Sequence, residues 1–213
     1  MKLKQMVQGL LYISALAGAA QVMAADLNVA GRIQPSGACS LALGNGGVVD
    51  LGTLTSRNLA RDGYREFYRQ ISLSIDCQTP TRVAIKGLDN REGTVLGGET
   101  GIVGFGMGAA GGRKTGRYYL LPLNRWGDGQ RLVHLVKKTW SGSGWQVSDV
   151  GSTRYTSAND ISSWAEPGQA NPQAFKKITS DLEFVIQIAP ASELDLSQEI
   201  AIDGSATMEL VYL

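Results

Sequence analysis

The chain has 213 residues, of which 43% are hydrophobic and 18% are charged, so a disordered or collagen-like chain is excluded and a sizeable core can form. The formal net charge is +1, which removes the usual electrostatic argument for nucleic acid as a partner. The 27 glycines, together with the scarcity of long helical patterns, favour short strands joined by tight turns.

Residues 1–24 have the pattern of a secretory signal peptide. Lys2 and Lys4 give a charged start, an apolar run over 7–20 follows, and Val22-Met23-Ala24 supplies the small-residue cleavage pattern. A single membrane anchor is the alternative, but the apolar run is shorter than the roughly 20 residues that a spanning helix needs. We therefore expect an exported mature chain over 25–213 without a membrane anchor.

Cys39 and Cys77 are the only cysteines of the chain, and both lie in the part predicted to be exported. In an oxidising compartment, such a pair most simply forms one disulfide. With His134 as the single histidine, the chain offers too few ligands at a recognisable spacing for a closed zinc site. We therefore expect a disulfide, and neither a metal ion nor a cofactor.

Past the signal, alternation of apolar and polar residues is the dominant pattern, and it indicates half-buried strands. Turn signals rich in Gly, Pro, Asn and Asp separate the alternating stretches, which is typical of an antiparallel β-sandwich. The alternating stretches are 27–33, 71–77, 83–85, 182–188 and 200–212.

Four arginines recur every four residues between Arg57 and Arg69, with Gly63 among them. Because charge runs are usually solvated faces, we expect a turn or short helix that leads into a strand beginning near Ile71. A basic ligand-binding stripe is the alternative.

Residues 104–112 are rich in glycine and contain a formal Gly-x-Gly-x-x-Gly pattern at Gly106, Gly108 and Gly111. A dinucleotide site needs a helix directly after this pattern, but residues 117–123 look like another strand. We therefore expect a bulged or tightly turned connection between two strands.

The sequence shows no catalytic constellation. His134 lies in an apolar, strand-like run, where a packed histidine is the default interpretation. The glycines and serines of 141–144 lack the spacing of a nucleophile elbow. We therefore expect that the protein is not an enzyme.

Several motifs carry a resemblance to a known family. They are Gly31-Arg32-Ile33 ahead of Cys39, then Val49-Asp50-Leu51-Gly52, the run from Ile71 to Cys77, and a C-terminal alternating strand with penultimate Tyr212. In this order, and with a single early disulfide, the chain resembles the pilin-like subunits of bacterial chaperone-usher fimbriae, in a poorly characterised branch of exported proteobacterial proteins. The resemblance covers roughly 27–98 and 181–213, and the middle is longer than in ordinary pilins.

The resemblance implies an all-β, immunoglobulin-like antiparallel sandwich that lacks its final strand, within a single domain over 25–213. A hydrophobic groove then lies open beside the last strand, where a periplasmic chaperone adds a strand that a neighbouring subunit later replaces at the usher. On this basis Met208, Leu210 and Tyr212 form the groove edge, and the carboxylate of Leu213 meets basic residues of the chaperone. The implied function is a structural or adhesive fimbrial subunit at the cell surface.

The resemblance also bears on position in the fibre. A subunit that donates a strand needs about five or six alternating residues ahead of its first core strand. The stretch 27–33 alternates, but in the family the Gly-x-Ile pattern shortly before the first cysteine belongs to the core. Only Ala25 and Asp26 then precede it, so we expect a subunit that accepts a strand without donating one, at the fibre tip.

The tryptophans all fall in a polar stretch, 118–164, that we expect to be a variable region. A tryptophan with polar neighbours suits stacking on a sugar ring, although packing in the core is the commoner fate of this residue. A glycan of a host or another surface is therefore a candidate partner, and a free-standing secreted carbohydrate-binding β-sandwich is the alternative function. The candidate ligand-binding residues are Trp126, Trp140, Trp145 and Trp164.

Overall fold

The structure is a computed structural model that describes residues 38–97, 104–138, 142, 144–148 and 160–213. All of them belong to one compact unit, Gln34–Leu213. The predicted signal peptide 1–24 and the stretch 25–33, on which the tip position rests, lie outside the described residues.

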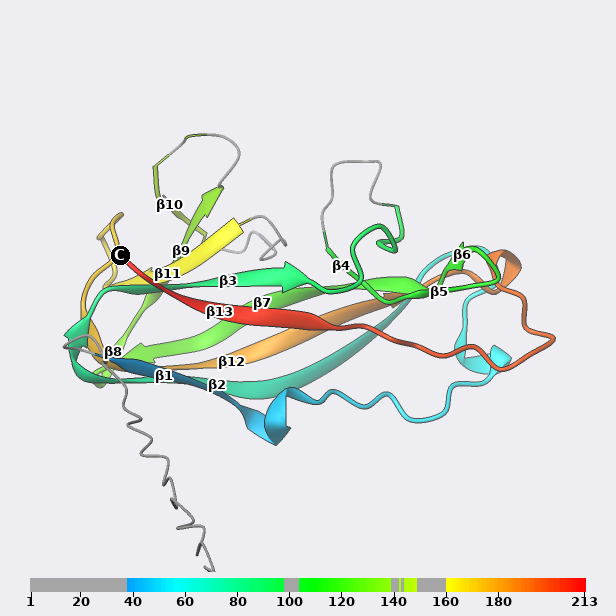
Figure 1. The fold of residues 1–213 in the computed structure, drawn as a ribbon, viewed down its shortest axis with the longest axis horizontal. Coiled ribbons are helices and arrows are strands. Elements are labelled where there is room, and N and C mark those ends of the chain that lie inside the picture. The colour runs from blue at the N-terminus through cyan, green and yellow to red at the C-terminus, as the bar shows by residue number, and fades with distance from the viewer. Residues whose placement is uncertain (1–37, 98–103, 139–141, 143, 149–159) are drawn as a thin grey trace, which may run out of the picture. The chain divides into compact units, whose positions relative to one another are not determined.

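Apart from three short 3₁₀ helices, the regular elements of the described part are β-strands (Figure 1). The helices are η1 (Gly44–Gly47), η2 (Ser56–Asn58) and η4 (Ala191–Glu193). The strands are β1 (Cys39–Leu43), β2 (Arg65–Thr81), β3 (Val83–Asp89), β4 (Phe105–Gly106), β5 (Ala109–Ala110), β6 (Arg113–Lys114), β7 (Gly116–Gly127), β8 (Gln130–Arg131), β9 (Val133–Lys138), β10 (Gln146–Val147), β11 (Asp160–Ala165), β12 (Phe175–Ile188) and β13 (Ala206–Tyr212).

The strands form two antiparallel sheets and the small hairpin β5-β6. The first sheet has the order β1-β2-β12-β7-β4 with β8 beside β7, and the second has the order β10-β9-β11-β3-β13. One core cluster joins the two sheets, and it includes Leu73 of β2, Ile85 of β3, Trp164 of β11 and Leu182 of β12. The expected all-β, immunoglobulin-like sandwich is therefore confirmed.

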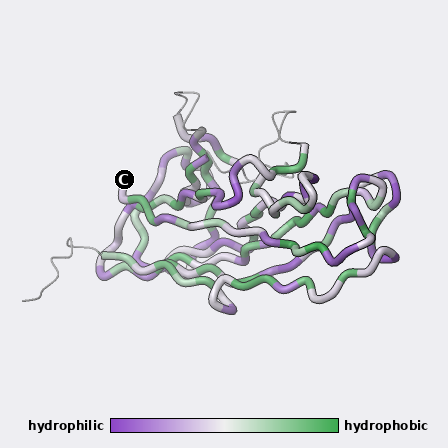
Figure 2. Tube along the Cα trace, turned by 45° about the vertical axis from the view of Figure 1, so that its right-hand side comes forward, coloured by the Kyte–Doolittle hydropathy of each residue, from purple (hydrophilic) through white to green (hydrophobic). Residues whose placement is uncertain are grey.

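The central part of β2 buries one face, as its alternation predicts. In β2, Leu73, Ile75 and Cys77 are buried while the residues between them are at least partly exposed. Figure 2 shows how closely hydrophobic and hydrophilic residues follow one another along the chain. The stretches 71–77 and 182–188 are therefore strands, as expected.

The disulfide between Cys39 and Cys77 is present. The two cysteines are register partners in the antiparallel pair of β1 and β2, so the bond links the edge strand of the first sheet to its neighbour. This confirms the pairing expected from the sequence.

Two strand boundaries differ from the expectation. The last strand begins at Ala206 and not at Ile200, because β3 ends at Asp89, the register partner of Ala206. Residues 200–205 therefore have no residue of β3 to pair with. Conversely, β2 begins at Arg65 and not near Ile71, because β12 supplies partners as far as the pair Arg65 and Ile188. Cross-strand pairing here overrides the local charge pattern.

The glycine-rich segment 104–112 forms the tight connection that was expected. It contains β4 and β5 and ends in the turn between β5 and β6. Gly111 and Gly112 occupy this turn with φ of 56° and 78°, a backbone region that favours glycine.

His134 lies in β9 and is only 1% exposed, so the packed interpretation is confirmed. Burial, together with the charge of Arg125, lowers the pKa of His134 to about 3. Its Nε2 and the Nε1 of Trp164, its register partner, have no hydrogen-bond partner in the described part of the chain. The folded protein therefore keeps this histidine neutral.

We predict that replacing both Cys39 and Cys77 by Ala lowers the free energy of unfolding by roughly 3 to 4 kcal/mol, because the unfolded chain gains the entropy that the crosslink removes. Urea denaturation of the oxidised protein and of the double variant measures this difference. Reducing the unchanged protein should lower its midpoint in the same way. Equal midpoints for all three samples would contradict the prediction.

We also predict that His134 makes folding pH-dependent. Below its ordinary pKa of 6.5, the unfolded chain binds a proton at His134 that the folded chain does not bind. The stabilising effect of the neutral histidine is therefore complete above this pH and is lost as the pH falls towards 3. Between about pH 7 and about pH 5, we expect a loss of about 2 kcal/mol in the free energy of unfolding. His134→Leu should remove most of this loss, and an identical pH dependence in the variant would refute the assignment.

Candidate functional site: an apolar groove beside the last strand

The second sheet ends at β13, which pairs with β3 on one side only among the described strands. In the first sheet, β1 is likewise an edge strand, paired with β2. An unpaired strand edge presents free backbone N–H and C=O groups to a further strand. The sandwich therefore has an open seam between β13 and β1.

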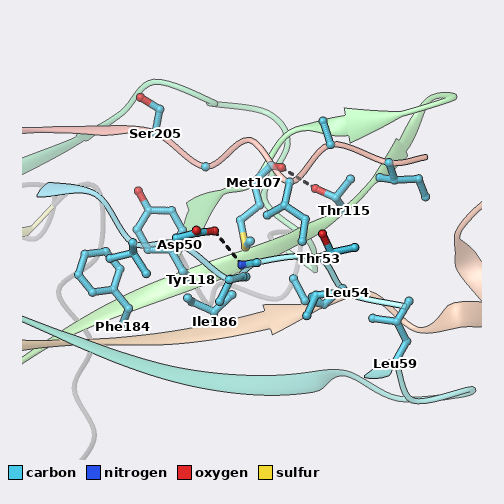
Figure 3. A pocket seen from close by; sticks show the side chains of 18 of the residues that line it. Asp50, Thr53, Leu54, Leu59, Met107, Thr115, Tyr118, Phe184, Ile186 and Ser205 are labelled. Atoms are coloured by element: carbon cyan, nitrogen blue, oxygen red, sulfur yellow. Dashed lines mark hydrogen bonds between the residues drawn. The ribbon is translucent and has the colours of Figure 1, made fainter. Parts of the chain in front are cut away.

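A groove of about 920 Å³ lies along this seam. Its floor is the inner face of the first sheet, together with residues of the segment before β7, and Figure 3 shows several of these side chains around the hollow. The floor residues are Met107, Thr115, Tyr118, Leu120, Phe184, Ile186 and Ile188.

Two irregular segments wall the groove. One is the wall segment, residues 48–59, and the other is the terminal strap, residues 194–205, which leads into β13. Leu51, Leu54 and Leu59 of the wall segment and Leu194 of the strap pack against the main core. Beside the strap, Ala206 and Met208 of β13 complete the rim.

Apolar side chains form the floor of the groove, and several of the polar groups in its lining are engaged locally. The Thr115 hydroxyl donates to the carbonyl of Met107 at 2.5 Å, and the Asp50 carboxylate accepts from the backbone N–H of Gly52 at 2.7 Å (Figure 3). Burial, with the charge of Asp89, raises the pKa of Tyr118 above its usual range, so its phenol is neutral. Asp50 and Glu199 are the charged residues of the described lining, which contains no basic side chain.

One end of the seam is tied. The backbone N–H of Cys39, at the start of β1, donates to the hydroxyl of Tyr212 at 2.9 Å. Next to it, the N–H of Leu213 donates to the carbonyl of Arg82 at 3.1 Å. The groove therefore extends from the first half of β13 towards the strap, away from this tie.

The terminal strap is anchored to the opposite end of the sandwich. Its Asp203 donates its backbone N–H to the carbonyl of Met107 at 3.1 Å and forms a 2.6 Å ion pair with Arg91. Gly108, with φ of 83°, lies against the strap, where an added Cβ would come within 3.5 Å of Asp203. These contacts set the distance between the strap and the groove floor.

The residues assigned to the groove edge from the sequence take different positions. Met208 lines the groove, whereas Leu210 packs against the core beyond it. Tyr212 is 47% exposed and reaches across to Cys39, and Leu213 is equally exposed. The alternation placed the residues of β13 on faces, but it did not indicate where the groove ends.

The three tryptophans that the structure describes lie in different surroundings. Trp164 is 1% exposed and belongs to the core, and Trp145 packs against the cluster of Val133, Leu135 and Ala165. Trp126 is 43% exposed on β7, and Trp140 lies outside the described residues. The described tryptophans therefore do not share one environment, and a ligand site that includes Trp140 stays a prediction.

No pattern in the sequence marks the groove floor as a site. The alternation of 182–188 indicates that Phe184 and Ile186 share a face, but not that this face lies below an open seam. Met107 sits in the glycine-rich segment, where no periodic signal marks it. These residues become recognisable only when the strap and the wall segment are in place.

Within the described part of the chain, no helix is long and apolar enough to cross a membrane. Nor do the described residues contain a cluster of three or more His, Cys, Asp or Glu side chains that could hold a metal ion.

Comparisons with known proteins give distant similarities. A family model described as a protein of unknown function, DUF1120, matches residues 27–130. The chain is 26% identical to the uncharacterized protein YhcF of Escherichia coli, over 99% of this chain and 98% of that protein. It is also 26% identical to protein GltF of Escherichia coli, over 88% of each chain. The family match spans the disulfide, the wall segment and the floor strand β7.

We predict that Tyr212→Phe lowers the free energy of unfolding by about 1 kcal/mol, because the N–H of Cys39 loses its hydroxyl acceptor. Tyr64→Phe is a matched control, since Tyr64 is similarly exposed, at 45%, and its ring contact with Arg117 survives the change. Urea denaturation of both variants tests the tie. If the two variants shift the midpoint equally, the hydroxyl of Tyr212 has no special role.

Proposed function

We propose that the protein is a structural or adhesive subunit of a chaperone-usher fimbria, and that the groove beside β13 accepts an extended strand from a partner. The observation that carries the proposal is that one edge of β13, which no described strand pairs, coincides with a groove of about 920 Å³ that has an apolar floor. A strand added there would pair its backbone with β13 and direct alternate side chains onto the floor.

The shape and chemistry of the groove favour this occupant. Its described lining combines an apolar floor with polar and acidic residues at its walls and contains no basic side chain, so a phosphate or another anion finds no basic partner there. An extended peptide with apolar residues at every second position matches the floor, whose side chains come from the adjacent strands β7 and β12. The free edge of β13 supplies the backbone partners that such a peptide requires.

The terminal strap adds a second argument. The alternation of Ile200, Ile202 and Gly204 continues that of β13, yet these residues are not in a strand. They lack a partner because β3 has already ended. An incoming strand would supply one, so filling the groove would extend β13 backwards into the strap.

Support for export comes from several directions. The Cys39–Cys77 disulfide is typical of an oxidising compartment, and residues 1–24 have the pattern of a signal peptide. The resemblance of the sequence to pilin-like subunits supplies the partners, which are a periplasmic chaperone, an usher and neighbouring subunits. The proposal includes no catalytic step, and the tip position remains a prediction from residues 25–33.

Co-expression in the periplasm with a panel of fimbrial chaperones tests the proposal. We expect that one of them forms a complex with the chain and raises the amount of soluble protein several-fold, because it covers the groove. Met208→Glu should weaken capture at least about 10-fold, because the complex would bury an unpaired carboxylate. Thr207→Glu is the matched control, since Thr207 is the adjacent, exposed residue of β13.

Recovery of the disulfide-bonded chain from the periplasm, checked for both variants, separates failed folding from failed capture. The proposal is wrong if the chain is equally abundant and monomeric without any chaperone. It is also wrong if a chaperone captures Met208→Glu as well as it captures Thr207→Glu.

A further inference from the structure

We propose that the outer face of the first sheet carries a saccharide-binding site centred on Trp126, independent of the groove. Of the tryptophans that the structure describes, Trp126 is the exposed one, at 43%. The flat apolar face of an indole ring suits stacking on the apolar face of a pyranose ring. The surroundings of this ring decide whether it can hold such a ligand.

Trp126 borders a shallow hollow of about 450 Å³ on this sheet. The hollow crosses three adjacent strands, β2, β12 and β7, and most of its lining side chains are polar. The lining residues are Ser72, Leu73, Ser74, Asp76, Asn124, Trp126, Lys177, Thr179, Ser180 and Asp181. An aromatic ring beside a polar hollow is the arrangement that stacking and hydrogen bonding to one sugar require.

One neighbour of the indole ring is the guanidinium of Arg131. Trp126 is the register partner of Arg131 on β8 and of Thr179 on β12. The Arg131 guanidinium lies over the ring, 5.5 Å from its centroid, and Arg131 is not part of the lining of the hollow. Trp126 therefore borders the hollow, while the guanidinium that lies over its ring belongs to a residue outside the lining. A ring positioned in this way loses little freedom when a ligand stacks on it.

Asn124 and Asp181 provide a pair of polar groups next to the ring. The Asn124 amide donates to the Asp181 carboxylate at 2.7 Å, which orients both side chains. Asn124 has φ of 46°, a left-handed conformation at the point where the register of β7 with β12 shifts. The remaining carboxylate and amide oxygens can accept hydrogen bonds from neighbouring hydroxyls of a sugar.

The charges around the hollow favour a neutral sugar. Within the lining, Asp76 and Lys177 lie across from each other at 3.8 Å with largely exposed side chains, and Asp181 adds a further negative charge. This balance gives an anionic saccharide such as a sialylated glycan no net attraction. The ligand class that fits is therefore a neutral hexose-terminated glycan.

The intact exported chain, with its disulfide, can be tested on an array that carries glycans ending in glucose, galactose, mannose or sialic acid. We expect binding to a neutral glycan. Trp126→Ala should weaken it roughly 3- to 10-fold through loss of stacking, and Asp181→Ala about 10-fold through loss of hydrogen bonding. Trp126→Phe should retain most of the binding. Tyr68→Ala is the matched control, since Tyr68 is an exposed aromatic residue of β2, at 53%, outside the hollow.

Circular dichroism and the urea midpoint show whether each variant is folded, and Trp126→Phe keeps the test informative if Trp126→Ala is not. The inference is overturned if the unchanged chain binds no neutral glycan or binds sialylated glycans alone. It is equally overturned if folded Trp126→Ala and Tyr68→Ala bind as the unchanged chain does.

Discussion

The free edge of β13 is the constraint on which the rest of the structure depends. In a closed sandwich, the strands of each sheet cover the whole inner face of the other sheet. Here the described second sheet stops at β13. The floor below the seam must then be covered by segments that are not strands. The wall segment and the terminal strap take this place, and their leucines pack on the core from both sides. The groove is what remains between them.

Cys39 connects the free edge to the rest of the fold through two bonds. Its sulfur is bonded to Cys77, and its N–H donates to Tyr212. The disulfide thus joins β1 to β2, while the hydrogen bond joins β1 to the end of β13. At this end of the seam, a disulfide and strand pairing fix β1. At the other end, the Arg91–Asp203 ion pair and single backbone hydrogen bonds hold the strap. A strand that entered the seam would therefore displace the strap more easily than the end of the seam that the disulfide fixes.

The first sheet serves two surfaces because side chains alternate along a strand. On β7, Leu120 faces the groove and Trp126 borders the outer hollow, because the register shift between Leu123 and Trp126 reverses the alternation between these two positions. On β12, Phe184 lies in the groove floor and Asp181 lies in the hollow. The proposed partner strand and the proposed saccharide would therefore contact different residues of the same sheet.

Local patterns in the sequence determined the sandwich class, the alternating faces of 71–77 and 182–188 and the tight turn at Gly111, because periodicity and turn chemistry depend on residues close together in the chain. The sequence also determined the Cys39–Cys77 pairing, because the chain contains no third cysteine. The tertiary structure alone decided where strands begin, since β12 extends β2 to Arg65 and the end of β3 leaves 200–205 unpaired. It also decided that Trp164 is core while Trp126 is surface. Alternation tells which residues share a face, but only the neighbouring strands settle whether that face is covered, paired or open.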